Sequence, residues 1–73
     1  MRRYLINVRK QLGYTQEQVA KGIGISQRAY SMIELNQINP SWAVAQRLER
    51  FFGIPASELL AVEEPEWPRT AEG

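Results

Sequence analysis

The side chains that could carry chemistry in this chain are few, and those typical of enzymes are missing. The 73 residues include no Cys and no His, which excludes disulfides, thiolate zinc sites and the usual serine and cysteine triads. The carboxylates of Glu17, Glu34, Glu49 and Glu58 fall on different predicted helices, so nothing pairs two of them for acid–base catalysis. We therefore expect no enzymatic activity, no cofactor, no metal and no small-molecule substrate.

A polar helix surface offers a different kind of chemistry. The stretch "SQRAYSMIEL" (residues 26–35) predicts a helix that Ser26 caps and whose buried stripe consists of Ala29, Tyr30 and Ile33. Its opposite side presents Gln27, Arg28, Ser31 and Met32, an unusual surface for a helix that had only to be soluble. Gln and Arg side chains can each form paired hydrogen bonds with base edges in the major groove of DNA.

The preceding segment would hold that helix at a steep angle. Thr15 and Gln18 have the spacing of a capping box, so we expect a helix from Gln16 that buries Val19, Ala20 and Ile23. Gly24 can adopt positive φ at the corner. A helix, a tight turn with Gly and a second helix form the helix-turn-helix arrangement, in which the second helix protrudes.

Three further helices complete an all-α prediction. The first runs from about Arg2 to Leu12, the fourth is capped by Ser41, and a short fifth runs from about Ala56 to Leu60. Pro55 offers no capping side chain, so an alternative is that Pro55 is the first residue of this fifth helix. The apolar pattern puts Tyr30 and Trp42 in the core. We expect Arg2 and Arg3 to form a solvated first turn.

The charges divide the chain into a basic body and an acidic end. Residues 1–50 carry eight Lys or Arg against three Glu, a net charge of +5, whereas residues 51–73 carry a net charge of −4. We predict one domain over residues 1–62 and an acidic, Pro-containing, disordered tail over residues 63–73. No apolar run approaches the ~20 residues of a membrane span, so we expect a cytoplasmic protein that does not enter membranes.

In its motifs the chain resembles the helix-turn-helix domains of the Cro and lambda-repressor type. The resemblance extends from about Leu5 to Leu60 and rests on "VRKQLGYTQEQVAKGIGIS", on "IEL" followed by "NPS", and on "ERFFGIPASELL". It implies a compact five-helix, lambda-repressor-like fold in which helices two and three form the helix-turn-helix. It also implies a prokaryotic or phage protein, nucleoid-associated when bound to DNA.

By position, the resemblance assigns roles to particular residues. The base-reading residues would be Gln27, Arg28, Ser31 and Met32 on the recognition helix. The DNA backbone would be contacted by Gln16 at the start of helix two and by Asn36, Gln37 and Asn39 in the loop after helix three. Arg9 and Glu34 would form a partly buried ion pair that serves the fold.

We interpret the chain as a sequence-specific DNA-binding transcriptional regulator, a repressor that binds double-stranded DNA as a homodimer on an inverted repeat. One alternative is an antitoxin, in which the same domain binds DNA and the tail binds a protein partner. Another is an adaptor whose helix-turn-helix binds protein instead of DNA. The polar set on helix three argues against the adaptor, because it retains the chemistry that reads base edges.

Overall fold

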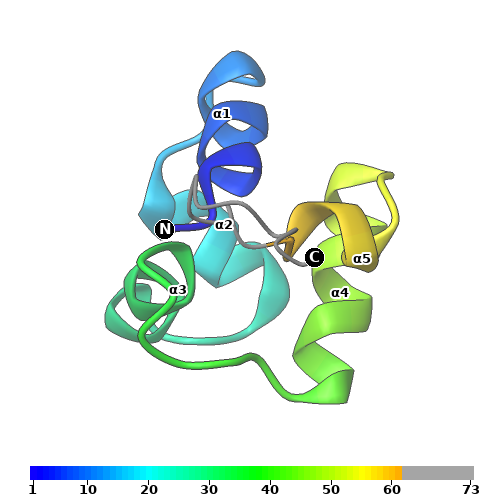
Figure 1. Cartoon of the computed structure of the whole chain (residues 1–73). Helices are drawn as coiled ribbons and strands as arrows, with labels where there is room; N and C mark the ends of the chain where they lie inside the picture. Colours follow the sequence, from blue (N-terminus) through cyan, green and yellow to red (C-terminus); the bar gives the residue numbers. More distant parts are fainter. Residues whose placement is uncertain (62–73) are drawn as a thin grey trace, which may run out of the picture.

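The computed structural model describes residues 1–61, which form helices joined by short turns and contain no strand (Figure 1). The helices are α1 (Arg3–Gln11), α2 (Gln16–Ile23), α3 (Gln27–Glu34), α4 (Trp42–Phe52) and α5 (Ala56–Leu59). This confirms the all-α, five-helix prediction. The predicted disordered tail, residues 63–73, lies outside the described residues. No helix within residues 1–61 is both long and apolar enough to cross a membrane.

Side-chain caps fix where three of the helices begin. Thr15 accepts a hydrogen bond from the backbone N–H of Gln18, and the Gln18 side chain accepts one from the backbone N–H of Thr15, which completes the predicted capping box. Ser26 and Ser41 cap α3 and α4 in the same way, through one bond each. Since the first N–H groups of a helix have no partner inside it, each cap removes an unsatisfied donor.

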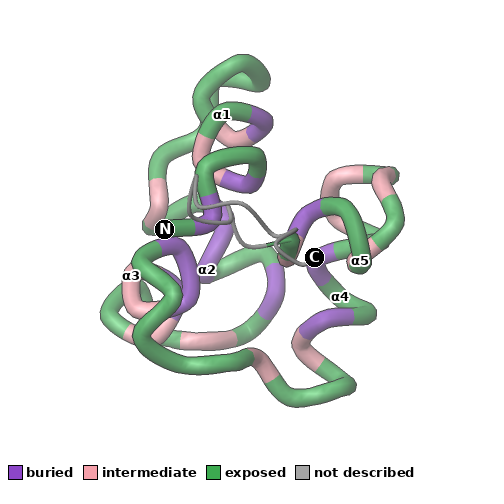
Figure 2. The backbone as a smooth tube through the Cα atoms, viewed as in Figure 1, coloured by how far each residue is buried: buried purple, intermediate pink, exposed green. Residues whose placement is uncertain are grey.

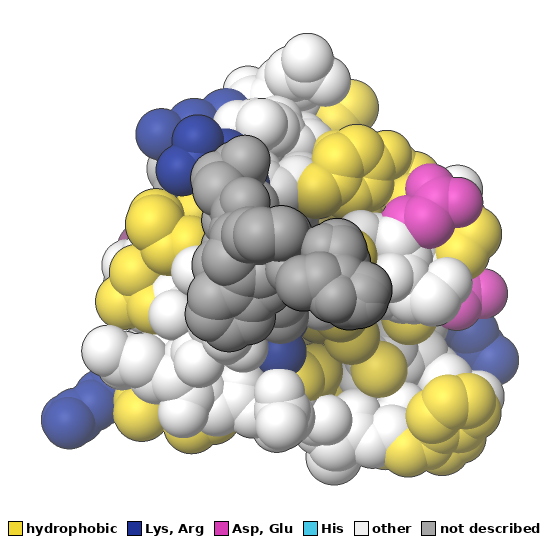
Figure 3. All heavy atoms as spheres, viewed as in Figure 1, with side chains coloured by type: hydrophobic (Ala, Val, Ile, Leu, Met, Phe, Trp, Pro, Cys, Tyr) yellow, Lys and Arg dark blue, Asp and Glu magenta, His cyan; other side chains and the backbone are white. Residues whose placement is uncertain are grey.

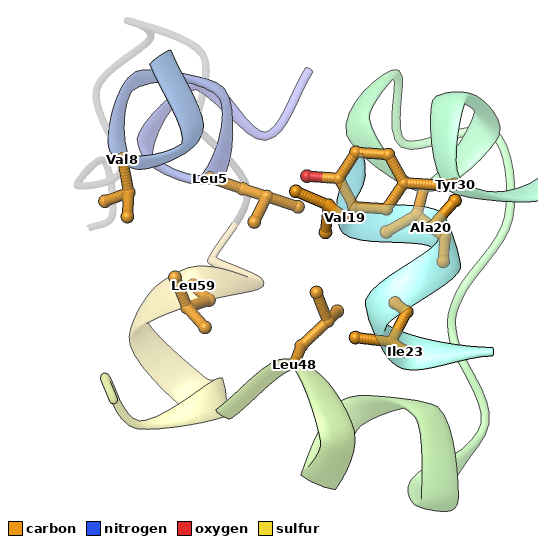
Figure 4. Packing of buried hydrophobic residues seen from close by; sticks show 9 residues of the cluster. Leu5, Val8, Val19, Ala20, Ile23, Tyr30, Leu48 and Leu59 are labelled. Carbon is orange, nitrogen blue, oxygen red and sulfur yellow. The ribbon is translucent and has the colours of Figure 1, made fainter. Parts of the chain in front are cut away.

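The core lies where the buried sides of all five helices meet (Figure 2). It is built from Leu5, Val8, Val19, Ala20, Ile23, Tyr30, Ile33, Leu48 and Leu59. Figure 4 shows the Tyr30 ring lying across Val19 and Ala20, while Leu48 and Leu59 approach from α4 and α5. The predicted burial of Tyr30 is therefore confirmed.

Gly22 lies at a close approach between α2 and α4. A Cβ atom at this position would lie 2.5 Å from Cε1 of the Phe51 ring, far closer than packed carbon atoms allow. Glycine lowers helix propensity by roughly 1 kcal/mol relative to alanine, and here the absent side chain makes room for an aromatic ring.

The predicted start of α5 at Ala56 is confirmed. The alternative start at Pro55 is wrong, because Pro55 precedes the helix with ψ of 137°. The backbone N–H of Ala56 instead donates to Oε1 of Glu49 in α4 at 3.0 Å. The carboxylate of Glu49 thus caps the first N–H of α5, which Pro55 has no side chain to do. This role explains why a glutamate occupies position 49 of α4.

The prediction for Trp42 is wrong, because its side chain is 77% exposed. Its spacing from Ala45 and Leu48 matches the apolar repeat, but α4 begins at the edge of the molecule, and its first turn extends past the other helices (Figure 1). Trp42 instead lines a shallow cavity with Gln46 and Arg50.

Candidate nucleic-acid interface

The turn between α2 and α3 is held by the backbone itself. Gly24 adopts φ of 79°, a left-handed conformation that side chains disfavour. Its N–H and that of Ile25 donate to carbonyls in the last turn of α2, Ile25 to Ala20 at 3.0 Å. A guanidinium N–H of Arg47 in α4 donates to the carbonyl of Ile23 at 3.4 Å. The direction in which α3 leaves α2 is therefore fixed from two sides.

The two faces of α3 have opposite environments. Tyr30 and Ile33 are buried in the core. Of the four predicted base-reading residues, Gln27 and Arg28 are exposed and Ser31 and Met32 are half-buried. The first turn of α3 thus presents an amide and a guanidinium to solvent, both of which can form paired hydrogen bonds with base edges.

Gln16 is half-buried at the first position of α2, and its side chain is partly engaged. Its Nε2 donates to Oε1 of Glu34 at 2.9 Å, which ties the start of α2 to the end of α3. The second N–H of this amide is not used in that bond and lies beside the partial positive charge of the helix N-terminus.

Arg9 and Glu34 form an ion pair with two parallel contacts. Nε of Arg9 lies 2.6 Å from Oε2 of Glu34, and Nη2 lies 3.3 Å from Oε1. The third guanidinium nitrogen donates to the carbonyl of Tyr14 at 2.9 Å. Glu34 is buried and its hydrogen bond raises the pKa of the Arg9 guanidinium. The pair joins α1 to the end of α3 and lies inside the fold.

The hydroxyl of Tyr30 is enclosed beside this pair. It is buried and forms no hydrogen bond among the described residues. Burial, followed by the nearby carboxylate of Glu34, raises the pKa of Tyr30 well above its ordinary value of 10.0. Tyr30 is therefore neutral at any physiological pH.

The loop after α3 is exposed along most of its length (Figure 2). Asn36 adopts φ of 61°, a left-handed conformation that ends α3. The N–H of Gln37 donates back to the carbonyl of Met32 at 2.8 Å. Asn39 is exposed, and its Oδ1 accepts from the Arg2 guanidinium at 2.8 Å. The three predicted backbone-contacting residues of this loop thus lie on one exposed segment directly beyond α3.

The prediction for Arg2 is wrong, because Arg2 is buried. It is 3% exposed, and its guanidinium donates to three carbonyl oxygens and to Asn39. Burial lowers the pKa of this guanidinium. The sequence does hold a signal for this placement, since Arg2, Leu5 and Arg9 recur at the spacing of one helix face.

Figure 3 shows Lys and Arg side chains at the left, beside α1 and α3, and at the right edge, with hydrophobic side chains between them and at the lower right, over the first turn of α4. Among residues 1–61, no group of three or more acidic side chains could hold a metal ion.

Comparison with known proteins supports the same interpretation. A helix-turn-helix family model matches residues 5–59. The chain is 31% identical over 58 residues to the cryptic phage CTXphi transcriptional repressor RstR of Vibrio cholerae, over 80% of this chain and 52% of that protein. It is 33% identical over 64 residues to the HTH-type transcriptional regulator PuuR of Escherichia coli, over 88% of this chain and 34% of PuuR.

A third relative is shorter. The uncharacterized HTH-type transcriptional regulator MJ0272 of Methanocaldococcus jannaschii is 33% identical over 52 residues, which are 71% of this chain and 79% of that protein. The chain thus spans about half of RstR and a third of PuuR, but most of MJ0272. No solved structure gives a significant match. The predicted resemblance is confirmed, and the chain belongs to the helix-turn-helix family of the Cro and lambda-repressor type.

Proposed function

We propose that this chain is a transcriptional regulator that binds double-stranded DNA by inserting α3 into the major groove. The observation that carries the proposal is the exposure of Gln27 and Arg28 on the first turn of a helix whose other face is buried. A helix with its side chains is about 10–12 Å across, and the major groove is about 12 Å wide. The names of RstR and PuuR support regulation as the biological outcome.

Within this complex the residues divide by task. Gln27, Arg28, Ser31 and Met32 read base edges, and Met32 offers apolar contact to a thymine methyl group. Gln16 at the start of α2 and Asn36, Gln37 and Asn39 in the loop bind phosphates on either side of the groove. Phosphate contacts set the register of α3 but carry no sequence information.

The regulator acts as a dimer and represses by occupying a promoter. One domain of this size buries only ~600–1,000 Å² on DNA, which is too little for a specific operator. A twofold dimer doubles the contacts and places two copies of α3 in successive major grooves about 34 Å apart.

Selection of bound fragments from random double-stranded DNA, at two salt concentrations, tests the proposal. We expect an inverted repeat with half-sites about one helical turn apart. If no motif is recovered and binding disappears at moderate salt, only the electrostatic attraction to phosphates is present. That result would overturn the proposal.

The role of Arg28 is tested on the selected site. Arg28→Ala should relax the preference at one base position, at a cost of ~1–3 kcal/mol. Arg50→Ala, which removes the same charge from α4, is the matched control and should leave every base preference unchanged. If Arg28→Ala instead weakened binding to all sequences alike and lowered the slope of log affinity against log salt by about 0.9, the loss of one phosphate contact, Arg28 would be assigned to the DNA backbone.

A further inference from the structure

Arg2 connects the loop after α3 to the rest of the fold. Its guanidinium donates to the carbonyl of Ile38 at 3.2 Å and to Oδ1 of Asn39 at 2.8 Å. Within residues 1–61, these are the hydrogen bonds that join Ile38 and Asn39 to other residues. The first half of the loop, in contrast, is bonded back to α3 through the N–H groups of Asn36 and Gln37.

The same guanidinium is anchored on the end of the recognition helix. Nη1 of Arg2 donates to the carbonyl of Ile33 at 2.5 Å, and the backbone N–H of Arg2 donates to the carbonyl of Glu34 at 2.8 Å. Nε donates to the carbonyl of Leu60 beyond α5. Because the guanidinium is rigid and planar, these bonds fix the distance between the loop and α3.

The contact with Asn39 also sets the direction of an amide. A guanidinium has N–H donors and no acceptor, so the atom of Asn39 that faces it must be the oxygen. The Nδ2 group then points elsewhere, and within the described chain its two N–H donors are unused. Asn39 is exposed, so those donors are accessible from outside.

We infer that Arg2 is a positioning residue for DNA-backbone binding: it holds the loop at a fixed distance from α3 and turns the Asn39 amide so that Nδ2 can donate to a phosphate. The inference rests on the proposed function. Arg2 does not itself touch DNA, because it is 3% exposed and four of its five N–H donors are bonded to oxygens of the protein. It acts through Asn39.

A double-mutant cycle on the selected operator tests this dependence. Arg2→Met and Asn39→Ala should each weaken binding to all sequences alike, by roughly tenfold, the cost of one charge-assisted hydrogen bond. If Arg2 acts through Asn39, the double variant should lose about tenfold as well, because neighbours that share one function are not additive. A loss of about a hundredfold, the product of the two single effects, would overturn the inference.

The salt dependence separates positioning from direct contact. Neither variant removes a cation that touches DNA, so both should keep the wild-type slope of affinity against salt. A slope lower by about 0.9 for Arg2→Met would mean that Arg2 neutralises a phosphate itself, and would also overturn the inference. Base preferences, read from the same selection, should not change.

A measurement on the free protein makes failure of the inference distinguishable from failure of the proposed function. Backbone order parameters at Ile38 and Asn39 should fall in Arg2→Met, while those of α2 stay at the wild-type level; unchanged values at the loop would overturn the inference. If these values fall but the wild type selects no DNA motif, the proposed function has failed and the role of Arg2 in DNA binding fails with it. Arg2→Lys, which keeps the charge but not the planar fork, replaces Arg2→Met if the latter is unfolded at the assay temperature.

Discussion

Arg2 and Arg9 lie one on each side of Leu5, and both bind the last residues of α3, but with different partners. Arg9 meets the carboxylate of Glu34 through two contacts, at 2.6 and 3.3 Å. Arg2 meets only neutral oxygens, and no carboxylate among the described residues pairs with it. The charge of Arg9 is therefore compensated by the opposite charge of Glu34, and that of Arg2 by the dipoles of carbonyl and amide groups.

The difference determines what each site can do. The Arg9–Glu34 pair places no constraint on the loop after α3, because each charge is compensated by the other. A guanidinium held by carbonyls gathers several backbone segments around it, here the ends of α3 and α5 and the loop at Ile38. The orphan carbonyls at a helix C-terminus also carry partial negative charge, which suits a cation. The first site locks two helices, and the second organises a loop.

The largest expected effect is that of Arg9→Met. It would leave the carboxylate of Glu34 buried with only the amide of Gln16 as partner, and removing one partner of a buried ion pair costs about 3–5 kcal/mol. Urea unfolding followed by circular dichroism measures the loss.

The control for Arg9→Met is the double variant Arg9→Met with Glu34→Gln, which should recover part of the lost stability because no buried charge is left unpaired. If the single and double variants were equally destabilised, the energetic role of the charge would be contradicted.

Arg2→Met should destabilise the fold by less, about 2 kcal/mol, since it leaves carbonyls without a donor and not a carboxylate. The carbonyl of Ile33 still accepts from the N–H of Asn36, and Ile38 lies in an exposed loop where water can replace the guanidinium. The same urea titration compares the two variants. If Arg2→Met lowered the free energy of unfolding more than Arg9→Met, the expectation that the ion pair contributes more to stability would be contradicted.

Tyr30 gives a smaller effect that depends on pH. Its pKa is raised in the folded protein by burial and by Glu34, whereas the unfolded chain releases this proton near pH 10. Stability conferred by the neutral hydroxyl is therefore complete below pH 10 and falls as the pH rises above it, by about 1.4 kcal/mol per pH unit. Tyr30→Phe should abolish that fall.

The measurement for Tyr30 is the urea midpoint at pH 8 and at pH 11. We expect the wild type to lose about 1 kcal/mol more than Tyr30→Phe between these values. Equal losses in the two proteins would show that the Tyr30 hydroxyl is not sealed from water when the chain is folded.

Local signals in the sequence account for most of the fold. The caps at Thr15, Ser26 and Ser41 and the left-handed residues Gly24 and Asn36 were predictable, because each depends on a few adjacent residues. The core positions of α2 and α3 followed from helical periodicity in the same way.

The wrong predictions concern residues whose surroundings come from distant parts of the chain. Arg2 is buried only because residues 33, 38, 39 and 60 converge on it. Trp42 is exposed although Val44 and Ala45 in the same turn of α4 pack toward the core. The start of α5 at Ala56 was predicted, but its cap was not, because the capping carboxylate belongs to Glu49, seven residues before Ala56. No local sequence pattern encodes contacts between residues so far apart in the chain. The assignment of the exposed face of α3 to DNA remains a prediction, because it too depends on a partner outside the local sequence.

The smallest effect on stability, and the most informative for the comparison, is that of Asn39→Asp. This change gives Arg2 a carboxylate at the position where Oδ1 now lies 2.8 Å from Nη2, so that the Arg2 site becomes more like the Arg9 site. Asn39 is exposed, so the gain in the free energy of unfolding should be only about 0.5 kcal/mol, and it should vanish at high salt.

The effect of Asn39→Asp on DNA binding should have the opposite sign. The variant keeps the contact with Arg2 but loses the Nδ2 donor and adds a negative charge beside the phosphates, so affinity should fall while thermal stability rises. Asn39→Ala, which loses the donor without the added charge, separates the two causes: the difference between the variants is electrostatic and should shrink as salt increases. A variant that gains stability and also retains full affinity would mean that the loop is positioned by Arg2 for a reason other than binding phosphate.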